Sequence, residues 1–127
     1  MKNIIDIGII GGSGYTGMEL VKILGRHKHS RIALITSRSR EGKKIGELYP
    51  ALKNENYGDL RFISSPKTSE LAAMDVLFLC LPPHSSMEYV RKLGKLKDTM
   101  IIDIGSDFRI KDPLAYEKWY GTKHIFP

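Results

Sequence analysis

The residues best suited to chemistry form a glycine cluster that follows an apolar run near the start of the chain. Residues 4–10 are apolar and β-branched apart from Asp6 and Gly8, which is typical of a buried central strand in a parallel sheet. The glycines that follow fit two registers of a dinucleotide-binding loop, Gly12-x-Gly14-x-x-Gly17 and Gly11-x-x-Gly14-x-x-Gly17. One glycine permits a tight turn, one lets the backbone approach a pyrophosphate, and one lets the next helix pack closely on the strand. We therefore predict that the loop binds a nucleotide phosphate through Gly11, Gly12, Ser13, Gly14, Tyr15, Thr16 and Gly17; the alternative is a simple turn.

A second polar cluster, Ser37, Arg38 and Ser39, follows the next apolar run, residues 31–36. In dinucleotide-binding folds a carboxylate at this point accepts hydrogen bonds from the ribose of NAD, whereas an arginine accommodates the 2′-phosphate of NADP. No Asp or Glu occupies residues 36–40, and a guanidinium between two hydroxyls suits a phosphate dianion. The cluster therefore predicts NADP as the cofactor, with an ordinary solvated basic loop as the alternative.

Strands and helices alternate along the rest of the chain. We expect residues 18–26 to continue the first helix, with Gly25 positioned to end it. We expect an irregular stretch over 41–66 with one short strand at 60–63. Later elements are a helical turn at 68–74, a buried strand at 75–81, a helix from a Ser85–Glu88 capping box to about 93, a strand at 100–104, and a helix bounded by Asp112-Pro113 and Gly121.

This alternation predicts an α/β fold, namely a Rossmann-type, doubly wound, mainly parallel sheet with helices on both faces. We expect this chain to lack the last elements of that fold. Residues 1–127 are predicted to form one NAD(P)-binding domain. In such folds ligands lie beyond the carboxyl ends of the strands, so the polar segments 13–16, 37–40, 82–86 and 106–109 are expected at one edge of the sheet.

Composition narrows the class of partner. The net charge of +6 and the pI of about 9.5 suit an anionic ligand, but the basic residues are scattered, so we expect no nucleic-acid partner. No apolar run approaches the roughly 20 residues of a membrane span. The single cysteine, Cys80, excludes an internal disulfide and favours a cytoplasmic location.

Six segments together resemble the N-terminal part of the N-acetyl-γ-glutamyl-phosphate reductase family. They are Gly-Gly-Ser-Gly-Tyr-Thr-Gly (11–17), Thr-Ser-Arg-Ser (36–39), Leu-Tyr-Pro (48–50), Asp-Val-Leu-Phe-Leu-Cys-Leu-Pro (75–82), Ser-Asp-Phe-Arg (106–109) with Asp112-Pro113, and Tyr-Glu-Lys-Trp-Tyr-Gly (116–121). The sequence departs from the family at Pro82-Pro83-His84-Ser85, where Pro-His-Gly is usual.

The resemblance implies an NADPH-dependent reductase of arginine biosynthesis that converts N-acetyl-γ-glutamyl phosphate to the semialdehyde. It implies further cofactor contacts at Pro82 and His84, and a substrate contact at Arg109, whose alternative is a salt bridge to Asp107 or Asp112. The family's nucleophilic cysteine lies in an Asn-Pro-Gly-Cys segment and its histidine in a later domain, and this sequence contains neither. We therefore expect no catalytic residue and no turnover from this chain alone, and a homo-oligomeric full-length protein.

Other interpretations of the sequence stay open. Among enzymes, the runner-up is aspartate-semialdehyde dehydrogenase or an amino-group-carrier acyl-phosphate reductase, and outside enzymes it is a stand-alone NADP-sensing module. We expect Cys80 to be a buried structural residue rather than a nucleophile. The His27 and His29 pair has a weak metal spacing, so no metal is predicted. We expect Tyr116, Trp119 and Tyr120 to pack the last helix.

Overall fold

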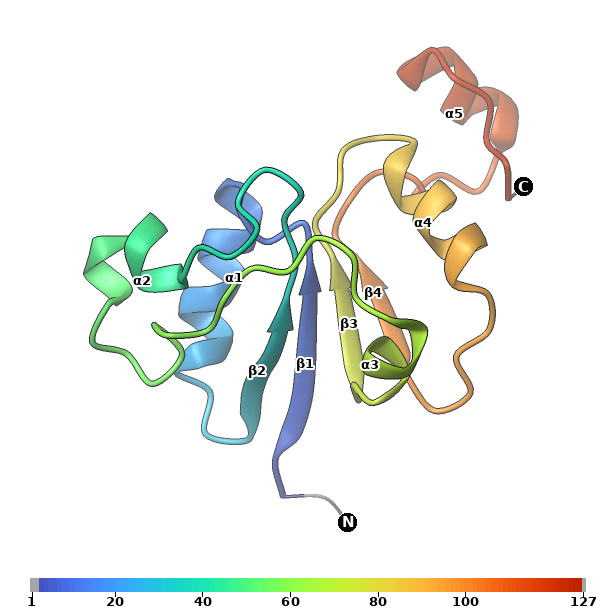
Figure 1. Ribbon diagram of the computed structural model, residues 1–127. Coiled ribbons are helices and arrows are strands. Elements are labelled where there is room, and N and C mark those ends of the chain that lie inside the picture. The colour runs from blue at the N-terminus through green and yellow to red at the C-terminus, as the bar shows by residue number, and fades with distance from the viewer. Residues whose placement is uncertain (1–2, 127) are drawn as a thin grey trace.

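Four parallel strands form one sheet in the computed structural model, which describes residues 3–126. They are β1 (Ile5–Ile10), β2 (Ser30–Ile35), β3 (Val76–Leu79) and β4 (Met100–Asp103), in the spatial order β2-β1-β3-β4. The order reverses between β1 and β3, which is the topological switch point of a doubly wound sheet. All four strands end at the upper edge in Figure 1, so the predicted fold class is confirmed.

Helices cover both faces of this sheet (Figure 1). They are α1 (Tyr15–Gly25), α2 (Ile45–Leu48), the 3-10 turn η1 (Pro50–Leu52), α3 (Thr68–Ala72), α4 (Ser85–Leu93) and α5 (Pro113–Tyr120). In Figure 1, α5 lies beyond the carboxyl edge of the sheet, near the C-terminus. Within residues 3–126, no helix combines the length and the apolar character needed to cross a membrane.

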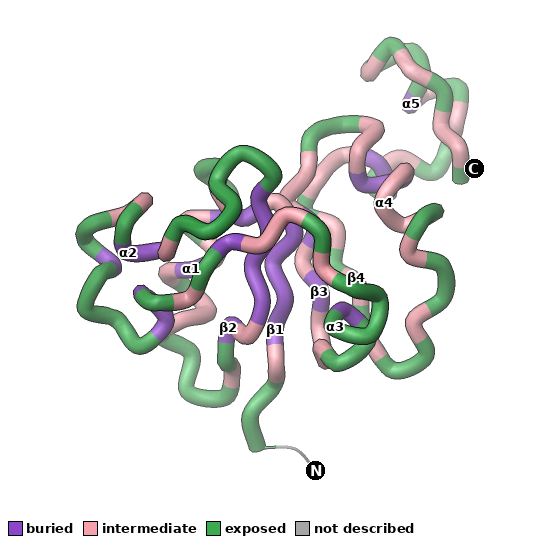
Figure 2. Tube along the Cα trace, in the orientation of Figure 1, coloured by how far each residue is buried: buried purple, intermediate pink, exposed green. Residues whose placement is uncertain are grey.

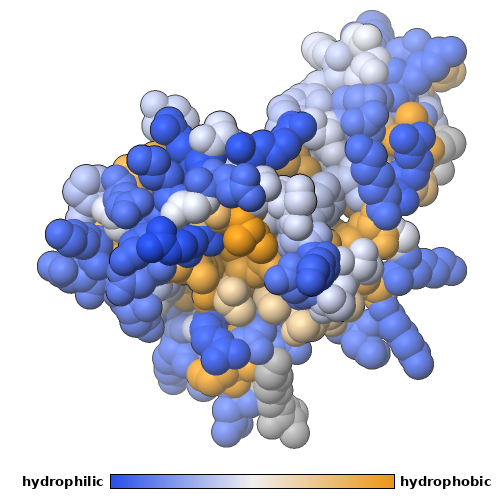
Figure 3. All heavy atoms as spheres, viewed as in Figure 1, coloured by the Kyte–Doolittle hydropathy of each residue, from blue (hydrophilic) through white to orange (hydrophobic). Residues whose placement is uncertain are grey.

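Two apolar cores pack against the opposite faces of the sheet, because successive strand side chains alternate between faces. On one face Ile7 and Ile9 pack with Val21 of α1 and Ile45 of α2. On the other face a second core joins β1 and β3 to α3 and α4, and its buried members are Ile10, Leu34, Leu71, Leu77 and Leu79. Figure 2 shows the buried residues concentrated in these central strands, whereas most of α5 is exposed or partly exposed. The face seen in Figure 3 is largely hydrophilic at its rim and apolar at its centre.

The stretch 41–66 is more ordered than predicted. It contains the helical turns α2 and η1, and the strand predicted at 60–63 is wrong, because Arg61 and Ile63 each make only an isolated bridge, to Lys44 and Thr36. Gly25 does end α1, but not by a left-handed turn. A Cβ at Gly25 would lie 2.0 Å from Tyr57 Cε1, so the tyrosine ring can pack here only against a glycine.

The last helix follows its predicted boundaries, but not all of its aromatic residues pack. Asp112 caps the helix by accepting a hydrogen bond from Leu114 N at 3.1 Å, and Gly121 ends it. Tyr116 is fully buried, whereas Trp119 is 76% exposed, so the packing expected of Trp119 is wrong for this chain.

Candidate nucleotide-binding site

Three glycines of the loop after β1 are required by the fold itself. Gly11 has a φ of +77°, and a Cβ there would lie 2.6 Å from the Cys80 carbonyl oxygen. A Cβ on Gly12 would lie 2.4 Å from Ile35, and one on Gly17 would lie 2.5 Å from the Gly12 backbone. These contacts explain the tight turn and the close approach of α1 to the sheet. They would exist whether or not the loop binds a ligand.

Gly14 is different, because nothing in the protein requires a glycine there. It precedes α1 with a φ of −85°, which any residue can adopt, and a Cβ would meet no atom within 4 Å. A side chain at this position would therefore fit the protein but occupy the space in front of the loop. This is the position at which a pyrophosphate needs bare backbone.

The loop also presents unused hydrogen-bond donors. Within the described residues, the backbone N–H groups of residues 13–16 donate to no other residue, whereas Gly12 N donates to the Thr36 carbonyl at 2.8 Å. These open donors stand at the start of the 11-residue helix α1, where the helix dipole favours negative charge. The arrangement fits an anion such as the pyrophosphate of a dinucleotide.

The cluster after β2 lies directly beside this loop. Ser37 is buried, and its hydroxyl donates to Ser13 Oγ at 2.8 Å, so Ser37 braces the loop. Arg38 and Ser39 are exposed. Thr36, which sequence analysis did not select, accepts a hydrogen bond from Gly11 N at 3.0 Å through its hydroxyl.

A cavity of about 340 Å³ opens between the two clusters and α4. Gly11, Ser37 and Arg38 line one side of it, and Ser85 and Lys92 of α4 line the other. Two of the polar segments selected in the sequence thus meet at one hollow on the carboxyl edge. No local signal in the sequence points to Lys92, because its position at the cavity depends on how α4 packs.

Pro82 and His84 do not line this cavity. The His84 ring lies 3.5 Å from a Glu88 carboxylate oxygen and 3.3 Å from the Thr122 hydroxyl, while its backbone N–H donates to Asp107 Oδ1 at 2.8 Å. Its φ of 72° and ψ of −30° lie in a region that strains residues with a Cβ. The departure noted at Pro82–Ser85 therefore coincides with a strained turn before α4.

Replacing His84 by glycine should relieve this strain. We expect His84→Gly to raise the free energy of unfolding by about 1 kcal/mol relative to His84→Ala, because both variants lose the ring contacts but only glycine tolerates the positive φ. Urea unfolding of the two variants measures the difference. Equal midpoints would contradict the assigned backbone strain.

Sequence analysis placed Asp107 in a polar segment and offered it only as a partner of Arg109, so it missed the role that this residue has before α4. Its buried carboxylate accepts hydrogen bonds from His84 N at 2.8 Å, Met87 N at 2.9 Å and Tyr116 Oη at 2.6 Å. Burial alone would raise the pKa of Asp107, but these three hydrogen bonds and the nearby His124 together outweigh burial and lower it.

Asp107 also replaces the capping box predicted for α4. His84, not Ser85, precedes the first helical residue, and it makes no side-chain cap. The predicted Ser85–Glu88 box is therefore wrong. A carboxylate from a segment 20 residues away accepts instead from Met87 N in the first turn of the helix and from His84 N just before it.

Arg109 lies at a different hollow from the glycine loop. Its guanidinium donates to Tyr120 Oη at 2.7 Å, and in the described part of the chain it pairs with neither Asp107 nor Asp112. It lines a cavity of about 560 Å³ with Asp103 and Phe108, among other residues. The structure thus does not bring Arg109 into the cavity that holds Gly11 and Arg38.

Cys80 has the environment of an unreactive thiol. It follows the last residue of β3, is partly buried, and packs against the core beside α1. Burial, with a smaller effect from the Asp103 carboxylate, raises the pKa of the thiol to about 11. A thiol with this pKa is protonated at neutral pH and is a poor nucleophile.

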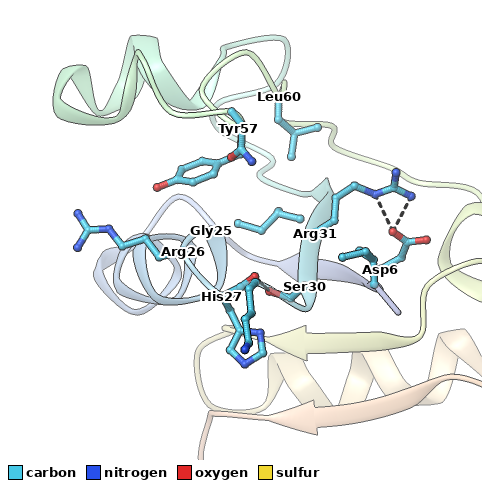
Figure 4. A pocket seen from close by; sticks show the side chains of 12 residues that line it. Asp6, Gly25, Arg26, His27, Ser30, Arg31, Tyr57 and Leu60 are labelled. Atoms are coloured by element: carbon cyan, nitrogen blue, oxygen red, sulfur yellow. Dashed lines mark hydrogen bonds and ion pairs between the residues drawn. The ribbon is translucent and has the colours of Figure 1, made fainter. Parts of the chain in front are cut away.

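A further hollow, of about 730 Å³, lies at the opposite end of the sheet (Figure 4). Arg31 pairs there with Asp6 at 2.6 Å, and the Tyr57 ring stacks over Gly25. The exposed His27 lies beside it, but no group of three or more metal-ligating side chains occurs among residues 3–126. The Tyr57 hydroxyl is buried and has no hydrogen-bond partner in that part of the chain.

Comparisons with known proteins agree with this geometry. A family model described as "Semialdehyde dehydrogenase, NAD binding domain" matches residues 6–126. N-acetyl-gamma-glutamyl-phosphate reductases of Alkalilimnicola ehrlichii and Pseudomonas aeruginosa are each 42% identical to the chain, over 123 and 125 residues. Each match covers 97% of this chain but 35% of the relative, so the chain spans about a third of the length of these curated relatives.

Two solved structures share the fold. Aspartate semialdehyde dehydrogenase from Candida albicans, with NADP, aligns with a TM-score of 0.61 at 18% identity, over 87% of this chain and 32% of that one. The enzyme from Francisella tularensis aligns with a TM-score of 0.57 at 20% identity, over 87% and 29%. At such identities the likeness concerns the fold alone.

Proposed function

Since the chain belongs to the semialdehyde dehydrogenase NAD-binding domain family, we propose that residues 1–127 are the NADP-binding domain of an acyl-phosphate reductase. The proposal rests on Gly14. Neither packing nor backbone conformation requires a glycine there, and the absence of a side chain leaves the loop open to a pyrophosphate. The four open N–H groups at residues 13–16 supply matching donors. The bound nucleotide would supply a hydride.

The substrate proposal rests on the curated relatives. Relatives at 42% identity are named N-acetyl-gamma-glutamyl-phosphate reductases, whereas the aspartate semialdehyde dehydrogenases share 18–20% identity. We therefore propose reduction of N-acetyl-γ-glutamyl phosphate in arginine biosynthesis as the activity of the full-length protein. Aspartate-semialdehyde dehydrogenase is the second candidate, and the stand-alone NADP-sensing module receives no support from these names.

The other site assignments are also proposals, and each rests on a different ground. Arg109 can offer its guanidinium to a carboxylate or phosphate, since it is exposed beside the cavity it shares with Asp103. Pro82 and His84 are proposed on the nicotinamide side from the resemblance alone. No catalytic residue is proposed within this chain, because packing against the core and a raised pKa make Cys80 a poor nucleophile. The cytoplasmic location and the homo-oligomer stay predictions.

Arg38 tests the choice of NADP over NAD. Its guanidinium is exposed at the mouth of the cavity beside the loop, so replacing it should affect the ligand rather than the fold. We expect Arg38→Glu to weaken NADPH binding at least about tenfold, because a charge-assisted hydrogen bond contributes about 1.5–3 kcal/mol. Calorimetric titration with NADPH and NADH measures the effect, and the affinity for NADH should change little.

Lys43→Glu is the matched control, because it changes the charge equally at an exposed residue that does not line the cavity. It should shift NADPH affinity by less than about threefold at physiological ionic strength. Equal affinities of the wild-type chain for the two nucleotides would refute the NADP assignment. Binding of neither nucleotide would refute the site itself.

A further inference from the structure

A tyrosine outside the glycine loop fixes the orientation of the loop's central peptide. Tyr49 Oη donates a hydrogen bond to the Ser13 carbonyl oxygen at 2.7 Å, across 36 residues of sequence. Ser13 is held from a second direction, since its hydroxyl accepts from Ser37 Oγ at 2.8 Å. The residue that precedes Gly14 is therefore clamped at both its side chain and its carbonyl group.

The peptide geometry gives this clamp a consequence for binding. The described chain contains no cis peptide bond, so the Ser13 carbonyl and the Gly14 N–H point in opposite directions across one plane. While Tyr49 holds the carbonyl, the Gly14 N–H is directed away from Tyr49. A flip of this plane would be cheap next to a glycine, and would exchange the donor for a carbonyl oxygen that repels phosphate.

Tyr49 is itself rigidly placed. Its backbone N–H donates to the Ile45 carbonyl at 2.8 Å, its carbonyl accepts from Leu52 N at 2.8 Å, and Pro50 follows it. Its ring packs against the core formed by α1 and α2. Burial raises the pKa of the phenol, with Arg40 opposing, so the hydroxyl keeps its proton at neutral pH. The donor is thus permanent and held in place by the turn between α2 and η1.

We propose that Tyr49 is a positioning residue for the nucleotide pyrophosphate: its hydroxyl locks the Ser13–Gly14 peptide with the N–H toward the ligand. The inference rests on the proposed nucleotide site and deepens it. It gives the stretch 41–66 a role in binding, because the turns α2 and η1 within that stretch place Tyr49 beside the glycine loop. Tyr49 would not touch the nucleotide and would act through Ser13.

The test compares two phenol deletions and two ligands. Tyr49→Phe should weaken NADPH binding by about five- to tenfold, the range expected for one lost hydrogen bond. Tyr57→Phe is the control, because its hydroxyl has no partner among the described residues, and NADPH affinity should stay within about twofold. Calorimetry gives both dissociation constants, and circular dichroism confirms that each variant is folded.

Adenosine 2′-monophosphate separates positioning from a general loss of structure, because this ligand lacks the pyrophosphate. If Tyr49 acts through the Ser13–Gly14 peptide, Tyr49→Phe should weaken NADPH but leave this nucleotide's affinity unchanged in an NMR titration. An equal loss for both ligands, or an unchanged NADPH affinity, would overturn the inference while leaving the nucleotide site intact. A wild-type chain that binds no NADPH would overturn both.

Discussion

Gly14→Val should abolish measurable binding of NADPH while leaving the protein folded. The structure has room for the new side chain, since a Cβ at residue 14 meets no atom within 4 Å and the φ of −85° and ψ of −178° suit valine. The same side chain would fill the space that the pyrophosphate needs. Losing two charge-assisted hydrogen bonds, at about 1.5–3 kcal/mol each, weakens binding at least about a hundredfold.

The stability cost of this substitution should be small. Residue 14 precedes α1, and valine is a poorer residue than glycine at that position by about 1 kcal/mol at most. Urea unfolding and calorimetric titration of the same sample therefore separate the two effects. A folded Gly14→Val chain with wild-type affinity would reduce the loop to a simple turn.

Gly17→Ala provides the opposite case in the same loop. Its Cβ would lie 2.5 Å from the backbone of Gly12, so the contact can be relieved only by moving α1 away from the sheet. We expect this variant to lose about 1–3 kcal/mol of stability. The pair distinguishes a glycine kept for a ligand from one kept for packing, although both belong to the same sequence pattern.

Local sequence patterns predicted the four strands of the sheet, though not the absence of a strand at 60–63, because the causes of those four strands are local. The apolar run ending at Ile10 and the glycine cluster fix β1, the turn and the start of α1 without help from distant residues. The turns α2 and η1 lack this advantage. They are short, and hydrogen bonds from Ile45 N to Leu60 O at 2.9 Å and from Gly46 N to Gly58 O at 2.9 Å hold α2 in place. Such tertiary contacts leave no periodicity to detect.

The residues of the candidate site also fall into two groups, those with a local sequence signal and those without one. The glycines and Arg38 were found because their spacing from a strand end is itself the signal. The roles of Tyr49 and Asp107 were missed because each side chain bonds to a segment 20 or more residues away. Asp107 shows the limit of local rules most directly, since the Ser85–Glu88 pattern predicted a cap that a distant carboxylate provides instead.

Asp107→Asn should destabilise the protein by about 2 kcal/mol. Oδ1 accepts from His84 N and Tyr116 Oη, and Oδ2 accepts from Met87 N at 2.9 Å. An amide can keep the oxygen on one side only, so its NH₂ group would face a backbone N–H. A buried donor without an acceptor costs about 1–3 kcal/mol, and relaxation of the neighbouring loop does not restore the lost acceptor.

Asp112→Asn is the matched control, because Asp112 caps α5 from an exposed position and accepts a single hydrogen bond, from Leu114 N at 3.1 Å. Asparagine caps helices about as well as aspartate, so this variant should lose less than about 0.5 kcal/mol. Urea unfolding at neutral pH compares the two substitutions. Equal losses would show that the Asp107 carboxylate has no special role.

The effect of Asp107 should also depend on pH in a defined direction. Its hydrogen bonds lower its pKa in the folded protein below the ordinary aspartate value of 3.8. A carboxyl group with a depressed folded pKa contributes stability above its unfolded pKa and loses that contribution as pH falls through the folded pKa. The difference in stability between wild type and Asp107→Asn should therefore be constant above about pH 5 and shrink below pH 3.8. A difference that widens on acidification would mean that Asp107 is protonated in the fold, and that its three donors do not hold a carboxylate at the start of α4.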